Sequence, residues 1–334
     1  MHRPGAIPLR PLTVGDIYDG AIRIMRTNPG ATIGAALLVA AVTGLIPFLV
    51  SVFVGLTYGA VEGFNPFDPD AVLNRAEPTT AQMLGSSINF GGQMLGAVLQ
   101  SFGLLIVTGM VVHVVSAAVL GRTMSLGEAW AATRGRRWRL IRLVMFFFAV
   151  YALVFALIIA VFFVLLFAID PTSGAFAGIA LAAALMFLLL VPLLAWSWIR
   201  FYLLPVPILM LEDVGVIASI RRGYRLTAGS FWRTFGIALL TVILSAVAGS
   251  LITFPLGAIN AALLFGVGGA AGLIASSAIT AVSSIVSAAF LTPFTAAVTC
   301  LQYVDLRMRK EALDVQLMTA TGAGPGPAGP GSTG

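Results

Sequence analysis

Five long runs that contain no Asp, Glu, Lys or Arg constrain this chain more than any other feature of its sequence. The runs cover residues 27–61, 78–121, 143–169, 171–199 and 234–304. A helix of about 20 apolar residues crosses a bilayer. Each run can therefore span once, and the last, with 71 residues, can span twice. Backbone amides cannot remain unpaired in hydrocarbon, so spans are helices or closed barrels, and barrel strands alternate polar with apolar residues, which these runs do not. The sequence predicts an all-α, multi-pass membrane protein.

The composition excludes a water-soluble fold. Hydrophobic residues make up 59% of the chain and charged residues 10%, whereas about a quarter of the residues in a soluble domain are charged. A water-soluble core has no room for so much apolar surface. We expect residues 1–314 to form one integral membrane domain and the Gly- and Pro-rich residues 315–334 to form a disordered cytoplasmic tail.

The positions of the basic residues predict the orientation of the spans. Eighteen of the nineteen Lys and Arg residues fall into four clusters that the runs separate from one another. The clusters are Arg3, Arg10, Arg23 and Arg26; Arg122, Arg134, Arg136, Arg137, Arg139 and Arg142; Arg200, Arg221, Arg222, Arg225 and Arg233; and Arg307, Arg309 and Lys310. Because basic loops are retained in the cytoplasm, the clusters mark the inner side. The inner segments then sum to +10 (eighteen bases, eight acids) and the outer segments to −4 (one base, five acids).

This charge pattern predicts six spans with both termini in the cytoplasm. The spans lie near residues 32–57, 92–119, 143–168, 175–198, 235–256 and 273–301. A basic cluster follows the last run, so that run must cross an even number of times, and we expect its turn around Pro255, Asn260 and Gly266–Gly269. Arg outnumbers Lys by 18 to 1, which favours a GC-rich bacterial genome and therefore a bacterial plasma membrane.

Three predicted inner segments begin alike, which indicates an internal repeat. Each precedes a short amphipathic stretch and then a span. Thr13 with Asp16, and Ser125 with Glu128, have the spacing of a capping box, whereas Asp213 provides a cap without the box. Each unit is then a surface helix followed by a two-span hairpin, and the three hairpins are parallel. The units cover residues 13–120, 125–211 and 213–304. Chance similarity between juxtamembrane helices is the alternative.

The surface helices have further features in common. In the first, acidic residues near the start and basic residues near the end match the helix dipole. Its polar stripe is Asp16, Asp19, Arg23 and Arg26, and its apolar stripe is Val14, Ile17, Ala21 and Met25. We expect a break at Asn28–Gly30 after the first helix, and a Gly break followed by Trp and Arg after the other two. These residues are Gly135, Trp138 and Arg139, and Gly229, Trp232 and Arg233.

Two motifs carry a resemblance to a known family. One runs from Arg10 to Ile17 and the other from Tyr303 to Asp314. With them, nearly the whole chain resembles the membrane domain attached to some glycerophosphoryl diester phosphodiesterases, and the stand-alone bacterial relatives of that domain, which have no known function. The resemblance implies a six-helix membrane module, with hydrolytic chemistry supplied, where it exists, by a separate soluble barrel. We expect no such barrel here, because only about 30 residues follow the last span.

Polar residues inside two predicted spans are the candidates for function. His113 is the one imidazole within a span, and ionisable residues there are functional candidates. Gln93 and Gln100, with Thr108, recur at helical spacings among small residues that would form a close-packed, hydrogen-bonding face. These small residues are Gly92, Gly96, Gly103 and Gly109. A packing role is the alternative for the three candidates. Span six carries a hydroxyl stripe that either lines a polar path or admits another helix: Ser276, Thr280, Ser283 and Ser287.

The sequence offers no catalytic, cofactor or metal site. Two His and one Cys are too few for a His/Cys metal site, and one Cys cannot form a disulfide within a single molecule. No nucleophile elbow or P-loop motif is present. We therefore expect neither an enzyme nor a bound cofactor.

Seven arginines of the inner clusters are candidate contacts for lipid headgroups. They are Arg136, Arg137, Arg139, Arg221, Arg222, Arg225 and Arg233. They flank spans and surface helices, where the phosphates of anionic lipids are the nearest anions. We expect membrane lipids, and no nucleic acid, as partners of this basic surface.

Two classes of function fit these expectations. The first is a non-catalytic module that assembles with other membrane or envelope proteins, or organises lipid. The second is a transporter or lipid permease, which the repeat, His113 and the hydroxyl stripe suggest. The predicted spans carry no Asp, Glu, Lys or Arg, although coupled transport commonly uses one. The module is therefore the leading interpretation.

Overall fold

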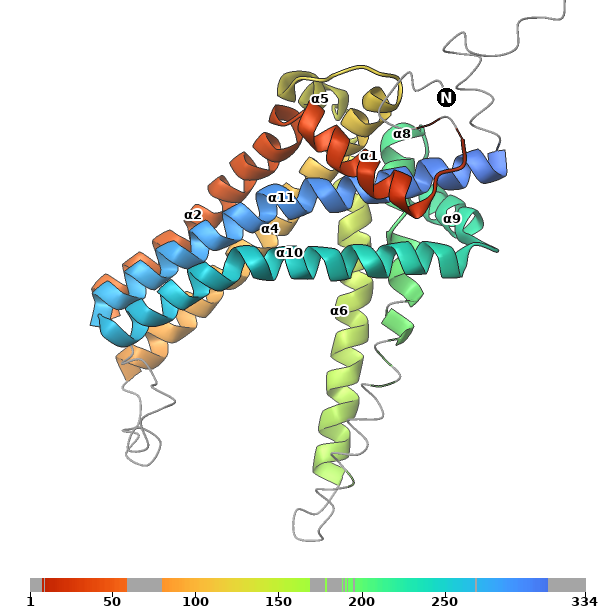
Figure 1. Ribbon diagram of the computed structural model, residues 1–334. Coiled ribbons are helices and arrows are strands. Elements are labelled where there is room, and N and C mark those ends of the chain that lie inside the picture. The colour runs from red at the N-terminus through yellow and green to blue at the C-terminus, as the bar shows by residue number, and fades with distance from the viewer. Residues whose placement is uncertain are drawn as a thin grey trace, which may run out of the picture. The chain divides into compact units, whose positions relative to one another are not determined.

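The computed structural model describes residues 8, 10–58, 80–168, 178, 188, 190, 192–194, 196–267 and 269–311. Every regular element in these residues is a helix (Figure 1), so the predicted all-α class is confirmed for them. The three-hairpin repeat stays a prediction. The tail at 315–334 and the predicted outer acids, such as Asp68, lie outside the described residues.

Six helical segments of the described chain are long and apolar enough to cross a membrane, as the charge pattern predicts. They are Gly30–Tyr58, Met83–Val119, Arg137–Ile158, Pro192–Leu211, Phe231–Leu263 and Ala271–Glu311. The fourth begins later than predicted, because most of residues 175–191 lie outside the described part of the chain, and it continues through Arg200.

The chain divides into two compact units, and α10 (Phe231–Gly266) and α11 (Gly269–Glu311) contribute residues to both. The first unit comprises Met1–Pro8, Thr13–Ala132 and Leu239–Val298, and the second comprises Leu9–Leu12, Thr133–Ala238 and Thr299–Gly334. The remaining helices of the first unit are α1 (Val14–Thr27), η1 (Gly30–Gly34), α2 (Ala35–Tyr58), α4 (Thr80–Val119) and α5 (Leu126–Ala132). Those of the second are α6 (Arg137–Ala168), η3 (Trp198–Tyr202), α8 (Pro205–Leu211) and α9 (Val216–Thr227).

The first predicted capping box is present, at the start of α1. The backbone N–H of Asp16 donates to Thr13 Oγ1 at 3.1 Å, and the backbone N–H of Thr13 donates to Asp16 Oδ2 at 3.0 Å. The helix ends at Asn28, as predicted, and the side-chain carbonyl of Asn28 accepts from the backbone N–H of Met124 at 2.9 Å. A local capping box therefore defines the start of α1, and a hydrogen bond to a distant segment holds its end.

The second capping box is also present, but the third predicted cap is wrong. Glu128 accepts from the backbone N–H of Ser125 at 2.7 Å, and this hydrogen bond holds the pKa of Glu128 below its usual range. By contrast, α9 begins after Gly215 without a side-chain cap. Asp213 lies two residues before that cap position and instead hydrogen-bonds Arg139, which lowers the pKa of Asp213.

The two predicted glycine breaks adopt a backbone that favours glycine. Gly135 has φ 82° and Gly229 has φ 76°, both in the left-handed region. Trp138 and Trp232, three residues further on, are among the most exposed large hydrophobic residues described, at 73% and 79%. The position of these segments at a membrane surface stays a prediction.

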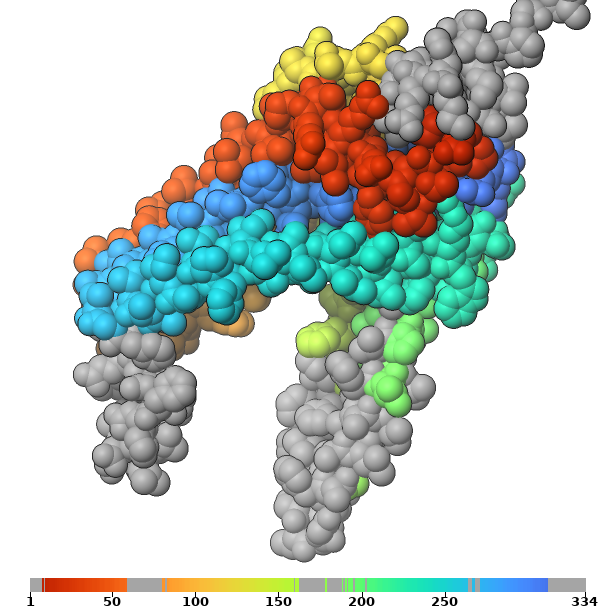
Figure 2. All heavy atoms as spheres, in the orientation of Figure 1, coloured from red at the N-terminus to blue at the C-terminus, as the bar shows by residue number. Residues whose placement is uncertain are grey.

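Glycines let α2 and α4 approach closely in the first unit. A Cβ built at Gly92, Gly96 or Gly103 would lie only 2.4–2.7 Å from a side-chain atom of α2. Three of the four glycines predicted for a close-packed face of span two, Gly92, Gly96 and Gly103, therefore form one against α2. Within this unit α11 lies alongside α2 and α10 (Figures 1 and 2), with Ile285 3.7 Å from a Cβ built at Gly44.

The turn between α10 and α11 is shorter than predicted. α10 continues through Pro255 and Asn260 to Gly266, and α11 begins at Gly269. The prediction that Pro255 and Asn260 mark the turn is therefore wrong. Membrane helices tolerate proline because neighbouring groups satisfy the carbonyl that loses its donor, and Pro47 and Pro293 likewise lie inside helices.

Asp305 joins three separate parts of the second unit. Its side chain is fully buried, and its carboxylate accepts from the backbone N–H of Leu12 at 2.8 Å. The same carboxylate pairs with Arg233 and Arg309, and both guanidinium groups also donate to the carbonyl oxygen of Leu12, at 2.7 and 3.0 Å. A buried carboxylate is stable only when it is paired and hydrogen-bonded. This cluster therefore anchors the N-terminal segment to α10 and α11.

A second charge cluster connects the segment between α8 and α9 with α11. Arg222 pairs with both Glu212 and Glu311, the latter at 3.0 Å. The hydroxyl of Tyr303 donates to Glu212 Oε1 at 2.6 Å, and Arg307 pairs with Glu311 at 2.9 Å. Each described acid of the second unit thus pairs with an arginine.

The glycine contact predicts different effects at two adjacent positions. Gly92→Ala should lower the free energy of unfolding by about 1–3 kcal/mol, because its Cβ overlaps Val50. Gly91→Ala should be neutral or slightly stabilising, because no atom lies within 4 Å of its Cβ and Ala favours helix. Thermal denaturation in detergent measures both, and equal melting temperatures would contradict the close α2–α4 packing.

The Asp305 cluster predicts a large loss of stability when its charge is removed. Asp305→Asn should lower the free energy of unfolding by about 2–3 kcal/mol. This is somewhat less than the loss when a fully buried ion pair is broken, because Arg233 is partly exposed. The matched control is Asp213→Asn, which should lower the free energy of unfolding far less, because that carboxylate is 79% exposed in its pair with Arg139. Chemical denaturation of the two variants in the same detergent decides whether the buried cluster has this role.

Candidate functional site

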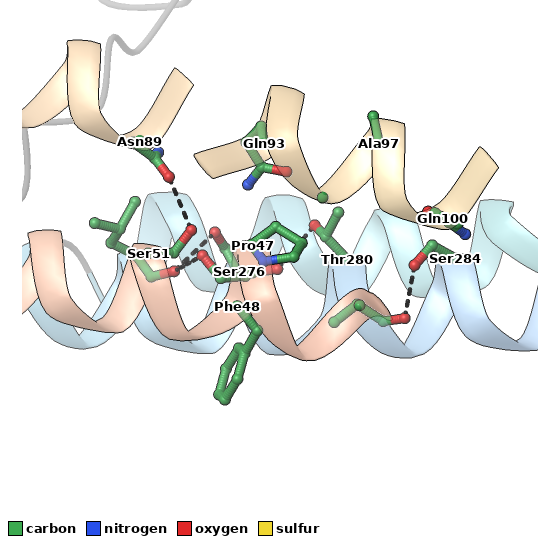
Figure 3. A pocket seen from close by; sticks show the side chains of 15 residues that line it. Pro47, Phe48, Ser51, Asn89, Gln93, Ala97, Gln100, Ser276, Thr280 and Ser284 are labelled. Atoms are coloured by element: carbon green, nitrogen blue, oxygen red, sulfur yellow. Dashed lines mark hydrogen bonds between the residues drawn. The ribbon is translucent and has the colours of Figure 1, made fainter. Parts of the chain in front are cut away.

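A cavity lined by polar side chains lies between α2, α4 and α11 in the first unit (Figure 3). Its volume is about 310 Å³, and none of the fifteen residues that line it is ionisable. Eight of the fifteen carry a hydroxyl or a side-chain amide: Ser51, Asn89, Gln93, Gln100, Ser276, Ser277, Thr280 and Ser284. All three helices belong to candidate spans. The cavity is therefore a neutral, hydrogen-bonding site among apolar helices.

Helix periodicity places the amides of α4 on one face. Asn89, Gln93 and Gln100 are four and seven residues apart, the spacings that return a side chain to the same side of a helix. Gly96 lies between them on this face, where its missing side chain makes room for Pro47 of α2. Gln93 and Gln100 are thus on the face predicted for them, and their function stays a prediction.

On α11 the cavity follows every fourth residue, Ser276, Thr280 and Ser284. A row of residues four apart winds slowly around the helix. It therefore diverges from the predicted hydroxyl stripe, which runs parallel to the helix axis. The first two members of the predicted hydroxyl stripe therefore line the cavity. Ser283 and Ser287, the other two members, do not.

The hydrogen bonds of the lining leave acceptors available. Ser51 Oγ donates to Asn89 Oδ1 at 2.9 Å and connects α2 with α4 (Figure 3). The hydroxyls of α11 donate to carbonyl oxygens of their own helix, as Thr280 does to Ser276 O at 2.9 Å. A hydroxyl that donates in this way keeps its lone pairs, so each can still accept a hydrogen bond.

Amide groups of three lining residues have hydrogen-bonding capacity that the described protein does not use. The NH₂ group of Asn89 and the side-chain amides of Gln93 and Gln100 make no hydrogen bond with any described residue. Gln93 is exposed and Gln100 is half-buried. An unpaired amide at membrane depth is unfavourable by several kcal/mol. These groups therefore require water, a ligand or another polypeptide.

His113 lies on α4 but outside the lining of the cavity. It is thirteen residues beyond Gln100, and at 100° per residue the helix turns it roughly 140° away from that side chain. It is half-buried between the buried residues Val112 and Val114. The structure therefore separates His113 from the two glutamines with which it was grouped, and its role stays a prediction.

The seven arginines proposed for lipid headgroups differ in their surroundings. Five already bind groups within the second unit: Arg136, Arg137, Arg139, Arg222 and Arg233. Arg221 and Arg225 are exposed and form no ion pair with a described residue. Lipid contact stays a prediction for all seven, and the first five also have contacts that stabilise the fold.

Four polar residues of the cavity are absent from the sequence-based candidates: Ser51, Asn89, Ser277 and Ser284. Asn89 precedes the predicted start of span two at residue 92, and Ser51 is the one hydroxyl among the apolar residues 44–56. The spacing of four between Asn89 and Gln93 is the signal that identifies Asn89. Ser51 has no such signal, because its importance arises from its contact with another helix.

No protein-family model, no curated protein and no solved structure matches the chain.

The cavity predicts a difference in reactivity between two engineered thiols. In a Cys300→Ser background, Thr280→Cys should react several-fold faster than Ser283→Cys with a small methanethiosulfonate, because the reactive thiolate forms in water and not in hydrocarbon. Position 280 lines the cavity and position 283 does not. Labelling rates in native membranes measure the difference, and equal rates would show that the cavity holds no accessible water.

Proposed function

We propose that this chain is a non-catalytic, multi-pass membrane protein that acts as a permease for small neutral polar solutes. The observation that supports this function is the cavity between α2, α4 and α11, which combines eight hydrogen-bonding side chains with no charge. Polar side chains at membrane depth are commonly part of a solute path when they face a cavity. The proposal favours the permease over the assembly module because it accounts for this arrangement.

The absence of charge in the cavity lining favours neutral polar solutes over ions. An ion that entered would leave water without meeting an opposite charge, which is strongly unfavourable in a medium of low dielectric constant. A neutral polar solute exchanges its hydrogen bonds with water for bonds to hydroxyls and amides. The volume of about 310 Å³ lies near the lower end of ligand sites, which range over about 300–1,000 Å³. A polyol or an amide of a few heavy atoms fits both criteria.

The proposal places the protein in a bacterial plasma membrane with both termini in the cytoplasm. The charge asymmetry of +10 against −4 between the predicted inner and outer segments supports cytoplasmic termini, and the excess of Arg over Lys supports a bacterial plasma membrane. The resemblance to the membrane domain of phosphodiesterases is consistent with a module of six spans. Phosphodiesterase activity is not part of the proposal.

A second function, assembly with another membrane protein, is favoured by one observation. Gln93 is exposed, and its amide has no partner among the described residues. Polar side chains of this kind associate with neighbouring helices in membranes. In this alternative a helix of a partner protein would close the cavity and satisfy the amides, and no solute would pass.

Solute flux tests the proposal directly. In proteoliposomes the protein should accelerate the entry of glycerol, erythritol or urea, and Gln93→Leu with Gln100→Leu should reduce that rate about thirtyfold, since two hydrogen bonds of about 1 kcal/mol each are lost. Ser101→Ala is the matched control, because Ser101 is exposed on α4 beside Gln100 but does not line the cavity. Light scattering after osmotic shock measures the rates.

The same preparations distinguish the two functions. Folded protein that accelerates none of the three solutes would contradict the permease. If the protein also purifies with a stoichiometric partner, and the Gln93→Leu variant loses that partner, the assembly function replaces the permease function.

A further inference from the structure

An apolar groove that contains a single cation lies on the first unit, separate from the polar cavity. Its volume is about 470 Å³, and it lies between the C-terminal half of α1 and residues of η1, α10 and α11. Figure 2 shows α1 (red) against α10 (cyan) and α11 (blue). Of the ten residues that line the groove, only Arg26 and Ser245 are polar. The groove therefore offers hydrocarbon contact along its length and one positive charge.

Specific contacts fix α1 in place beside the groove. The ring of Tyr18 stacks on Phe294 with centroids 6.1 Å apart, and its hydroxyl lies 3.0 Å from that of Thr241. Ile17, Ala21 and other residues on the inner side of α1 are fully buried. The shape of the groove thus follows from the packing of α1 on the long helices and does not depend on a loop.

The apolar wall of the groove is accessible. Ile22 of α1, Leu244 of α10 and Phe290 of α11 retain 42%, 42% and 46% of their surface. All three line the groove, and Leu244 and Phe290 belong to candidate spans. In a bilayer, the natural occupant of such a wall is an acyl chain.

Arg26 provides the complementary charge. It lies in the last turn of α1, is exposed, and forms no ion pair with a described residue. None of the groove residues is acidic. A guanidinium group binds phosphate through two parallel N–H···O bonds. Because α1 ends directly before the candidate span that begins at Gly30, Arg26 lies where a phospholipid headgroup would meet the helix.

We propose that this groove binds one anionic glycerophospholipid, with its phosphate on Arg26 and one acyl chain between Leu244 and Phe290. A soluble phosphate would leave the apolar walls unused, and a zwitterionic lipid would leave a net positive charge at the site. The site is distinct from the seven arginines predicted to contact headgroups. It is also independent of the permease function.

Lipid-dependent stability of the full-length protein tests the proposal. In detergent, phosphatidylglycerol should raise the melting temperature more than phosphatidylcholine does. Arg26→Gln should weaken the apparent affinity for phosphatidylglycerol about fivefold, as expected for the loss of one basic contact with an anionic lipid. The matched control is Arg23→Gln, because Arg23 is exposed on the same helix but does not line the groove.

A second measurement locates the acyl chain independently of stability. Phosphatidylglycerol with a photoreactive group on its chain should crosslink to peptides that contain Leu244 or Phe290, and Arg26→Gln should reduce the yield. Equal stabilisation by the two lipids, equal effects of the two Arg variants, or crosslinks only elsewhere on the chain would each overturn the proposal. Melting temperatures without added lipid show whether each variant is folded.

Discussion

The avoidance of unpaired polar groups in hydrocarbon is the constraint on which the structure depends. It makes the uncharged runs helical, because only a helix satisfies every backbone amide within a single span. It also confines the basic residues to the segments between runs, since arginine is costly to move into the bilayer. The described chain accordingly contains six long apolar helical segments, and its other regular elements are shorter helices. Close packing of these helices then relies on small residues, as at Gly92 and Gly103 of α4.

The same constraint explains two contrasting polar sites. In the second unit the buried carboxylate of Asp305 is satisfied by the protein itself, through the backbone of Leu12 and the guanidinium groups of Arg233 and Arg309. In the first unit the amides of Gln93 and Gln100 find no partner among the described residues. A satisfied cluster stabilises the fold, whereas an unsatisfied one requires water, a ligand or another chain. This difference is the reason to seek function at the cavity.

Local patterns in the sequence predict much of the fold but little of what depends on contacts between helices. The runs predict the spans, and the capping boxes at Thr13 and Ser125 are confirmed because both partners lie three residues apart. The placement of Pro255 in the turn is wrong, because a membrane helix can continue through proline, and the cap at Asp213 is wrong, because Asp213 pairs with Arg139 instead. The spacing of seven residues predicts that Gln93 and Gln100 share one face of α4. The contact of Ser51 with Asn89 and the burial of Asp305 could not be predicted, because their partners are 38 and up to 293 residues away. The threefold repeat and the resemblance to the phosphodiesterase membrane domain stay predictions.

The sidedness of the membrane helices is the central claim, and single-cysteine labelling tests it most directly. In a Cys300→Ser background, a membrane-impermeant thiol reagent is applied to intact cells and to inverted vesicles carrying Asp68→Cys or Arg134→Cys. The account predicts that position 68 is labelled only from the outside and position 134 only from the cytoplasmic side. Labelling of both positions from the same side would contradict the arrangement of the spans and the orientation assigned to the basic clusters.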